Sequence, residues 1–166
     1  MPNNQNCANQ IQCFQEVVEQ AIASFNEKEM YLIENDVSER CICARFAIHL
    51  TDALKYTLYN DYLVDVEYNR GNEGNQRSPK RMDGQPITVD LIVHKRGYDC
   101  NYGFDNLICI EMKKSTDRRN CTDDEGRLQK MVSYEYGFCY KAGFMILINM
   151  RNHHLGLEIK KSFFLQ

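Results

Sequence analysis

No long apolar run occurs in this sequence of 166 residues, and none approaches the length of a membrane-spanning helix. The opening residues, MPNNQNCANQ, lack the basic stretch and apolar core of a secretory signal. These two absences predict a cytoplasmic protein with no membrane partner. The length and a hydrophobic content of 43% favour a single domain over residues 1–166, with a core of its own.

Zinc-type cysteine spacing and a basic excess are missing as well. The eight cysteines include no C-x-x-C pair, and Cys41 and Cys43 stand too close together to pair comfortably on a helix. We interpret them as reduced thiols of a reducing compartment. The net charge of −3 does not announce a nucleic-acid-binding protein. A local basic stripe can nevertheless bind nucleic acid beside an acidic metal site.

An amphipathic helix is predicted over about residues 11–28, packed on the core or on a partner. Its apolar positions recur at near-helical spacing: Ile11, Phe14, Val18, Ile22 and Phe25.

A second helix is predicted from Asp36, because the run from Asp36 to Glu39 has the form of a capping box. Its apolar stripe is Cys43, Phe46, Ala47, Leu50 and Leu54. Glu39 lies four residues before Cys43, on the same stripe. Two interpretations stay open: Glu39 serves only the cap, or its carboxylate points into a functional site.

Three strand-like segments follow, YLVDVEYNRG, PITVDLIVHKRG and NLICIEMKK, with alternating or β-branched residues. Residues 71–85 are rich in Gly, Asn and Ser and predict a long loop. Its basic residues are Arg77, Lys80 and Arg81, with Arg70 at its base. These four side chains either lie in a solvated loop or form a flap over a phosphate backbone.

The second and third strand segments are predicted to pair as a hairpin. Asp90 near the start of one strand and Glu111 near the end of the next would then be neighbours. Side chains alternate along a strand, so Glu111 and Lys113 project from the same face. Such a charged cluster is costly to bury unless a divalent metal and a phosphate ester compensate it.

A third helix is predicted from Thr122, with Leu128 on its core face and Arg127 and Lys130 beside it. These two basic residues either bind phosphate or are simply solvated. The segment AGFMILINM predicts a buried strand, and residues 151–166 form either a last strand or a short helix.

This pattern resembles the PD-(D/E)XK superfamily of restriction-endonuclease-like nucleases. Asp90 stands for the first acid and Glu111-Met112-Lys113 for the (D/E)XK triplet, although Val89 occupies the place of the motif's proline. The element order over about residues 34–150 matches the αβββαβ core of that superfamily, with an N-terminal helix added. The fold class that this implies is α/β, with the mixed sheet of an α+β protein. The chain is also similar to small standalone bacterial members with E-R, E-Y-N-R, D-x-I-V-H and E-x-K-K motifs.

The resemblance implies a nuclease that hydrolyses DNA phosphodiesters with Mg²⁺ or Mn²⁺, in defence, restriction or repair. Asp90, Glu111 and the Met112 carbonyl would bind the metal, and Lys113 would activate water or offset charge. Glu39 would hold a second metal or a metal-bound water, as a further catalytic residue. DNA is favoured over RNA as the partner, and a homodimer is compatible with cutting both strands.

Two alternatives stay open. In the first, the chain cuts RNA or single strands with the same fold, and only loops distinguish these substrates. Alternatively, the fold is kept as a binding or assembly module without catalysis. Intact Asp90, Glu111 and Lys113 argue against the second alternative, and the missing basic excess argues mildly for it.

Overall fold

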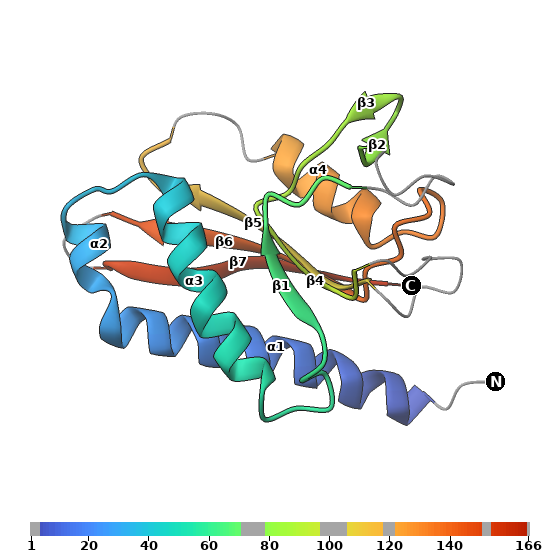
Figure 1. Cartoon of the computed structure of the whole chain (residues 1–166), viewed down its shortest axis with the longest axis horizontal. Helices are drawn as coiled ribbons and strands as arrows, with labels where there is room; N and C mark the ends of the chain where they lie inside the picture. The colour runs from blue at the N-terminus through green and yellow to red at the C-terminus, as the bar shows by residue number, and fades with distance from the viewer. Residues whose placement is uncertain (1–3, 71–78, 97–105, 118–121, 151–153, 166) are drawn as a thin grey trace.

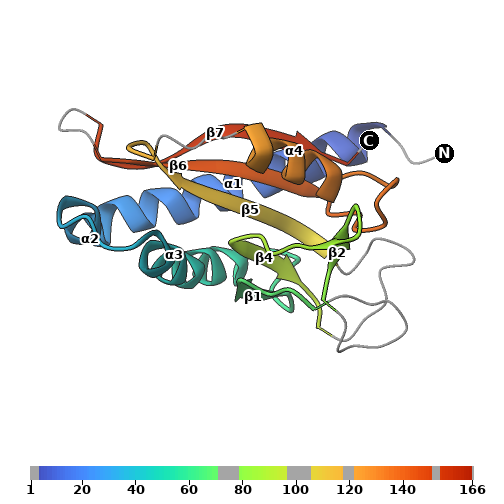
Figure 2. The same ribbon diagram turned by 90° about the horizontal axis from the view of Figure 1, so that it is seen from above.

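A mixed sheet of five strands, in the order β1-β4-β5-β6-β7, forms the centre of the protein (Figure 2). The computed structural model describes residues 4–70, 79–96, 106–117, 122–150 and 154–165, with side chains from residue 12 onward. The strands are β1 Leu63–Val66, β4 Leu91–His94, β5 Asn106–Lys114, β6 Ala142–Asn149 and β7 Gly156–Phe164. Neighbouring strands run antiparallel except β5 and β6, which are parallel.

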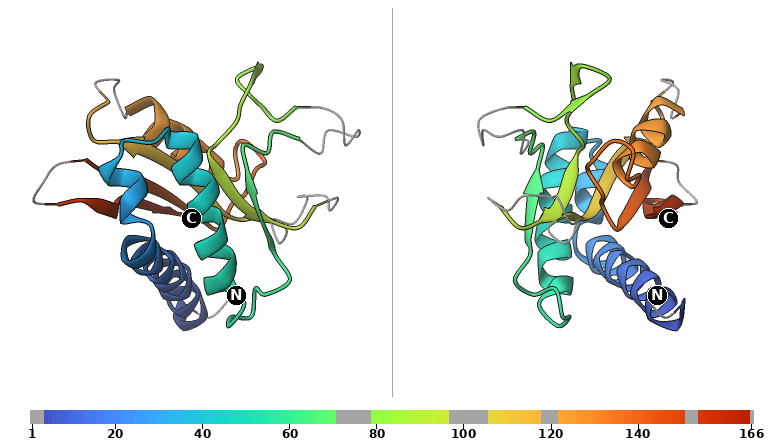
Figure 3. Two further views of the ribbon diagram at one scale, coloured as in Figure 1. Left: turned by 60° about the vertical axis from the view of Figure 1, so that its left-hand side comes forward. Right: turned by 90° about the vertical axis from the view of Figure 1, so that its right-hand side faces the viewer.

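Helices cover both faces of this sheet (Figures 1 and 3). They are α1 Asn4–Lys28, α2 Met30–Glu34, α3 Glu39–Leu54 and α4 Thr122–Met131. Side chains of α1 and α3 form one apolar cluster with the sheet, and side chains of α4 form a second. In the described part of the chain, no helix is long and apolar enough to cross a bilayer. The predicted mixed α+β architecture and the order of its main elements are confirmed, and β7 resolves the last segment as a strand.

Strand β5 separates the two apolar clusters because its side chains alternate between them. Ile108, Ile110 and Met112 pack in the cluster of α1 and α3, whereas Cys109 packs in that of α4. Glu111 follows Cys109 by two residues, so it shares the α4 face, as does Lys113. The sequence prediction that these two charged side chains project together is therefore confirmed.

The N-terminal helix is part of the core. The side chains of Phe14, Val18, Ile22 and Phe25 are buried against α3 and the sheet. The Asn26 side chain exchanges two hydrogen bonds with the backbone of Leu157 in β7, at 2.7 and 3.0 Å. Of the two roles that the sequence left open for this helix, the core role is the one that the structure supports.

The start of α3 differs from the prediction. Helix α3 begins at Glu39, and the side chain of Ser38 accepts the capping hydrogen bond from the Cys41 N–H at 3.3 Å. Asp36 lies outside the helix with a φ of 51°, and its carboxylate pairs with the Lys114 ammonium at 2.6 Å. The capping box predicted at Asp36 is wrong, because that carboxylate is engaged by a cation from β5.

The predicted loop of residues 71–85 is wrong over its last part. Strands β2 Arg81–Met82 and β3 Gln85–Pro86 form a small hairpin beside α4. Asp83 and Gly84 make its turn with φ values of 50° and 75°, the positive pair that a two-residue hairpin needs. The Asp-Gly dipeptide was the available signal. Residues 71–78, including Arg77, lie outside the described residues.

Strand β1 is shorter than the sequence suggests, because Glu67 adopts a φ of 51° directly after Val66. Side-chain alternation is interrupted there. Val64 and Val66 pack toward α1 and α3, whereas Tyr68 packs in the α4 cluster. The alternation along YLVDVEYNRG, from which the strand was predicted, therefore ends at Val66.

The core role of α1 is tested by Phe25→Ala. Phe25 is 0% exposed, so we expect the free energy of unfolding to fall by about 3–5 kcal/mol in urea titration. Gln20→Ala, at an exposed position of the same helix, is the control and should change it by less than about 0.5 kcal/mol. A small effect at Phe25 would contradict the packing described here.

Candidate active site

Asp90 and Glu111 meet where strand β4 begins. Leu91 pairs with Ile110, which brings Asp90 opposite Glu111. Oδ2 of Asp90 accepts a hydrogen bond from the backbone N–H of Met112 at 2.7 Å. The carboxylate thus takes the place of a strand partner, because β4 does not extend this far. In a strand the N–H and C=O of one residue face the same neighbour, so the Met112 carbonyl also faces this side.

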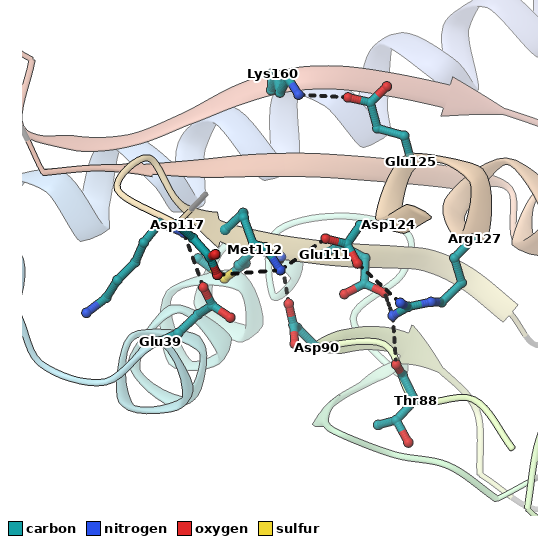
Figure 4. Close-up of polar contacts among 12 residues, drawn as sticks. Glu39, Thr88, Asp90, Glu111, Met112, Asp117, Asp124, Glu125, Arg127 and Lys160 are labelled. Carbon is teal, nitrogen blue, oxygen red and sulfur yellow. Dashed lines mark hydrogen bonds and ion pairs between the residues drawn. The ribbon is translucent and has the colours of Figure 1, made fainter. Parts of the chain in front are cut away.

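Glu111 is a buried carboxylate, with 4% of its surface exposed. The Arg127 guanidinium donates from Nη1 to Glu111 Oε1 at 2.5 Å (Figure 4). Burial raises the pKa of Glu111 well above its usual value, and the nearby charge of Asp90 raises it further. Burial also raises the pKa of Asp90. When both carboxyl groups are ionised, the positive charge of the neighbouring cations is therefore too small to balance their negative charge.

Helix α4 holds the cations of the site through Asp124. One oxygen of Asp124 lies 3.2 Å from the Lys113 ammonium, and the other lies 3.2 Å from Nη2 of Arg127. Asp117, after β5, lies 3.9 Å from the same ammonium. Lys113 is thereby held beside Glu111 between carboxylates from two different elements.

Glu39 faces the end of β5. Its Oε2 accepts a hydrogen bond from the backbone N–H of Lys114 at 3.2 Å (Figure 4). Ser38 makes the cap instead. The interpretation that Glu39 serves only the cap is therefore wrong, and its carboxylate points toward the same strand end as Asp90.

A cavity of about 370 Å³ opens between α3 and β1 at this point. It is lined by Ser38, Glu39, Arg40, Cys43, Val66, Glu67 and Asp90. Arg40 pairs with Glu67 at 2.8 Å, and the Glu67 N–H donates to the Asp90 carbonyl at 2.9 Å. The cavity gives solvent access to the side of Asp90 that faces α3.

The charge of this region is predominantly negative. Its carboxylates are Glu39, Asp90, Glu111, Asp117 and Asp124. Within the described residues, Lys113 and Arg127 are the cations in ion pairs with members of this group, so carboxylates outnumber cations in these contacts. The same negative charge acts on the buried Cys43 thiol, because burial and then the charges of Asp90 and Glu39 raise its pKa.

The donor set fits a hard divalent cation. Carboxylate oxygens of Asp90 and Glu111 and a backbone carbonyl are the ligand types that Mg²⁺ and Mn²⁺ prefer. Among the residues that the structure describes, no three His, Cys, Asp or Glu side chains stand together as a metal-binding group. Protein ligands would thus be the two carboxylates and the Met112 carbonyl.

The predicted basic residues lie in different surroundings. Lys80 is 7% exposed and donates to the Tyr140 hydroxyl at 2.6 Å, so it does not belong to a surface flap. Arg81 is exposed and donates to the Gly84 carbonyl at 2.8 Å. Lys130 pairs with Asp83, and Arg70 is exposed. Among the described residues that were predicted to bind nucleic acid, Arg127 is the one in contact with the acidic cluster.

Sequence reasoning missed Asp124 and Asp117. Asp124 stands four residues before the buried Leu128, which is the spacing that singled out Glu39 four residues before Cys43. The same pattern could have found it. Asp117 carries no comparable signal, because only the fold of the turn after β5 brings it to Lys113.

Comparison of the chain with models of protein families, with curated proteins and with solved structures found no match.

The raised pKa values predict how stability depends on pH. Between the usual carboxyl pKa and the raised value, the folded metal-free protein holds protons that the unfolded chain has lost. The free energy of unfolding should therefore fall as pH rises through that window. Asp90→Asn keeps an acceptor for the Met112 N–H and removes the charge, so its melting temperature should exceed that of the wild type near neutral pH.

Thermal melting of both proteins across pH, in chelator, measures this difference. Glu27→Gln, an exposed neutralisation on α1, is the control and should follow the wild-type curve. A melting temperature for Asp90→Asn that stays below the wild type at neutral pH would contradict the excess of negative charge.

Proposed function

We propose that this protein is a divalent-metal-dependent phosphodiesterase that hydrolyses nucleic acid, with DNA preferred to RNA and a restriction-endonuclease-like core. The observation that carries the proposal is the pairing of Asp90 and Glu111, two carboxyls with raised pKa, at one strand end. Lys113 lies on the same face. The order α3, β1, β4, β5, α4, β6 supports the assignment of the core.

A bound Mg²⁺ or Mn²⁺ would supply Lewis-acid stabilisation of the phosphate and a more acidic water. Asp90 and Glu111 would hold and orient this ion through their oxygens. Lys113 donates hydrogen bonds to the attacking water or to a phosphate oxygen, and Asp124 restricts where its ammonium can lie. Glu39 accepts a proton or orients a water at the cavity beside Asp90.

The second candidate is a nucleic-acid-binding or assembly module without catalysis. The observation that favours it is the Glu111–Arg127 ion pair, which already compensates one of the two carboxyls without a metal. Divalent cation binding distinguishes the two candidates, because only the phosphodiesterase requires a cation at Asp90.

Isothermal titration of Mn²⁺ tests the proposal. We expect wild-type protein to bind Mn²⁺ and Asp90→Ala to lose this binding, with parallel loss of cleavage of mixed DNA and RNA. Asp123→Ala, which removes an exposed carboxylate of α4, is the control and should retain both properties. A wild-type protein that binds no divalent cation would favour the binding module instead.

Lys113→Met separates metal binding from chemistry. The variant removes the ammonium and keeps the length of the side chain, so we expect Mn²⁺ binding to remain. Cleavage should fall by about 10²–10⁴-fold, the range for loss of a positioned proton donor or acceptor. Single-turnover cleavage assays measure the rate, and an unchanged rate would remove Lys113 from the proposed site.

A further inference from the structure

Arg127 occupies the position at which an incoming cation would compete. Its Nη1 donates to Glu111 Oε1 at 2.5 Å and to the Thr88 carbonyl at 3.2 Å, and its Nη2 donates to Asp124 at 3.2 Å (Figure 4). The Arg127 side chain is 29% exposed, whereas the Glu111 side chain is 6% exposed. A buried carboxylate is thus paired with a cationic side chain that reaches solvent.

We propose that Arg127 is an exchangeable counter-ion: it compensates Glu111 in the metal-free protein and moves to a phosphate oxygen of the substrate when a divalent cation takes Glu111. This inference rests on the proposed function and assigns a regulatory and substrate-binding role within that site.

Electrostatics makes the two cations mutually exclusive at Glu111. A divalent ion bound between Asp90 and Glu111 would lie close to the guanidinium, and like charges repel strongly where water is scarce. Arg127 is the group that can give way without leaving the protein, because its side chain has rotatable bonds. Metal affinity in the wild type is therefore lowered by the free energy needed to break the Glu111–Arg127 pair.

Asp124 limits how far Arg127 can move. The two residues are three apart on α4, and Asp124 contacts Nη2, not the Nη1 that contacts Glu111. When Nη1 leaves Glu111, this second contact keeps the guanidinium beside the metal site. A planar guanidinium with free N–H groups beside a metal is a strong donor to phosphate oxygens.

The test is a pair of affinities that should change in opposite directions. Arg127→Gln should bind Mn²⁺ about tenfold more tightly than the wild type, the effect expected for one charge-assisted hydrogen bond that no longer competes. In the Lys113→Met background, in which cleavage is slowed, Arg127→Gln should bind a DNA duplex about tenfold more weakly in Mn²⁺. A merely structural arginine would lower both affinities together.

Lys130→Gln is the matched control for the Mn²⁺ titration. It removes one positive charge and one ion pair, that with Asp83, from the next turn of α4. Its Mn²⁺ affinity should stay near the wild-type value. Arg127→Lys keeps the charge and should also stay near that value, whereas tightening equal to that of Arg127→Gln would overturn the counter-ion role.

The outcomes separate the two proposals. If the wild type binds Mn²⁺ and Arg127→Gln binds it no more tightly than Lys130→Gln, the exchange is overturned and the phosphodiesterase proposal stands. If neither the wild type nor Arg127→Gln binds Mn²⁺, both proposals fail. If Arg127→Gln does not fold, NMR of wild-type arginine side chains decides, because the Arg127 resonance must shift when Mg²⁺ saturates the protein.

Discussion

Two carboxyl groups, Asp90 and Glu111, are held together at the point where one strand stops and its neighbour continues, and the surrounding charges compensate only part of their repulsion. Strand β4 begins at Leu91, so the Asp90 carboxylate takes the hydrogen bond from Met112 that a strand would otherwise accept. Burial of Glu111 raises its pKa, and Arg127 offsets part of its charge. An arrangement of this kind costs stability, and the cation-binding role that we propose for it would offset that cost.

The close approach of α4 to the sheet makes this compensation possible. Gly143 in β6 lies under α4, where an added Cβ would meet Val132 and Cys109 at 3.2 and 3.3 Å. The absence of a side chain lets the helix lie close enough for Asp124 and Arg127 to reach β5. On the other face, α3 brings Glu39 to the backbone of Lys114. The site thus lies between two helices that are packed on opposite faces of one sheet.

Much of the framework follows from local periodicity. The alternation in NLICIEMKK predicts that Glu111 and Lys113 share a face, and the apolar stripe after Glu39 predicts an inward carboxylate. Both depend on spacings of two and four residues, which the chain geometry sets without distant contacts. The mixed sheet and the order of its main elements followed from the same patterns, while the cap of α3 at Ser38 and the hairpin at Asp83 did not.

The sequence by itself determined which residue types could form an acidic site and on which strands they would lie. Only the tertiary structure decided that Arg127 compensates Glu111, that Asp124 and Asp117 hold Lys113, and that Lys80 is buried against Tyr140. The physical reason is that faces and strand ends are set by short-range backbone geometry. Side-chain contacts between α4, β5 and the β2–β3 hairpin depend on how these separate elements pack. The local sequence around each residue does not indicate that packing.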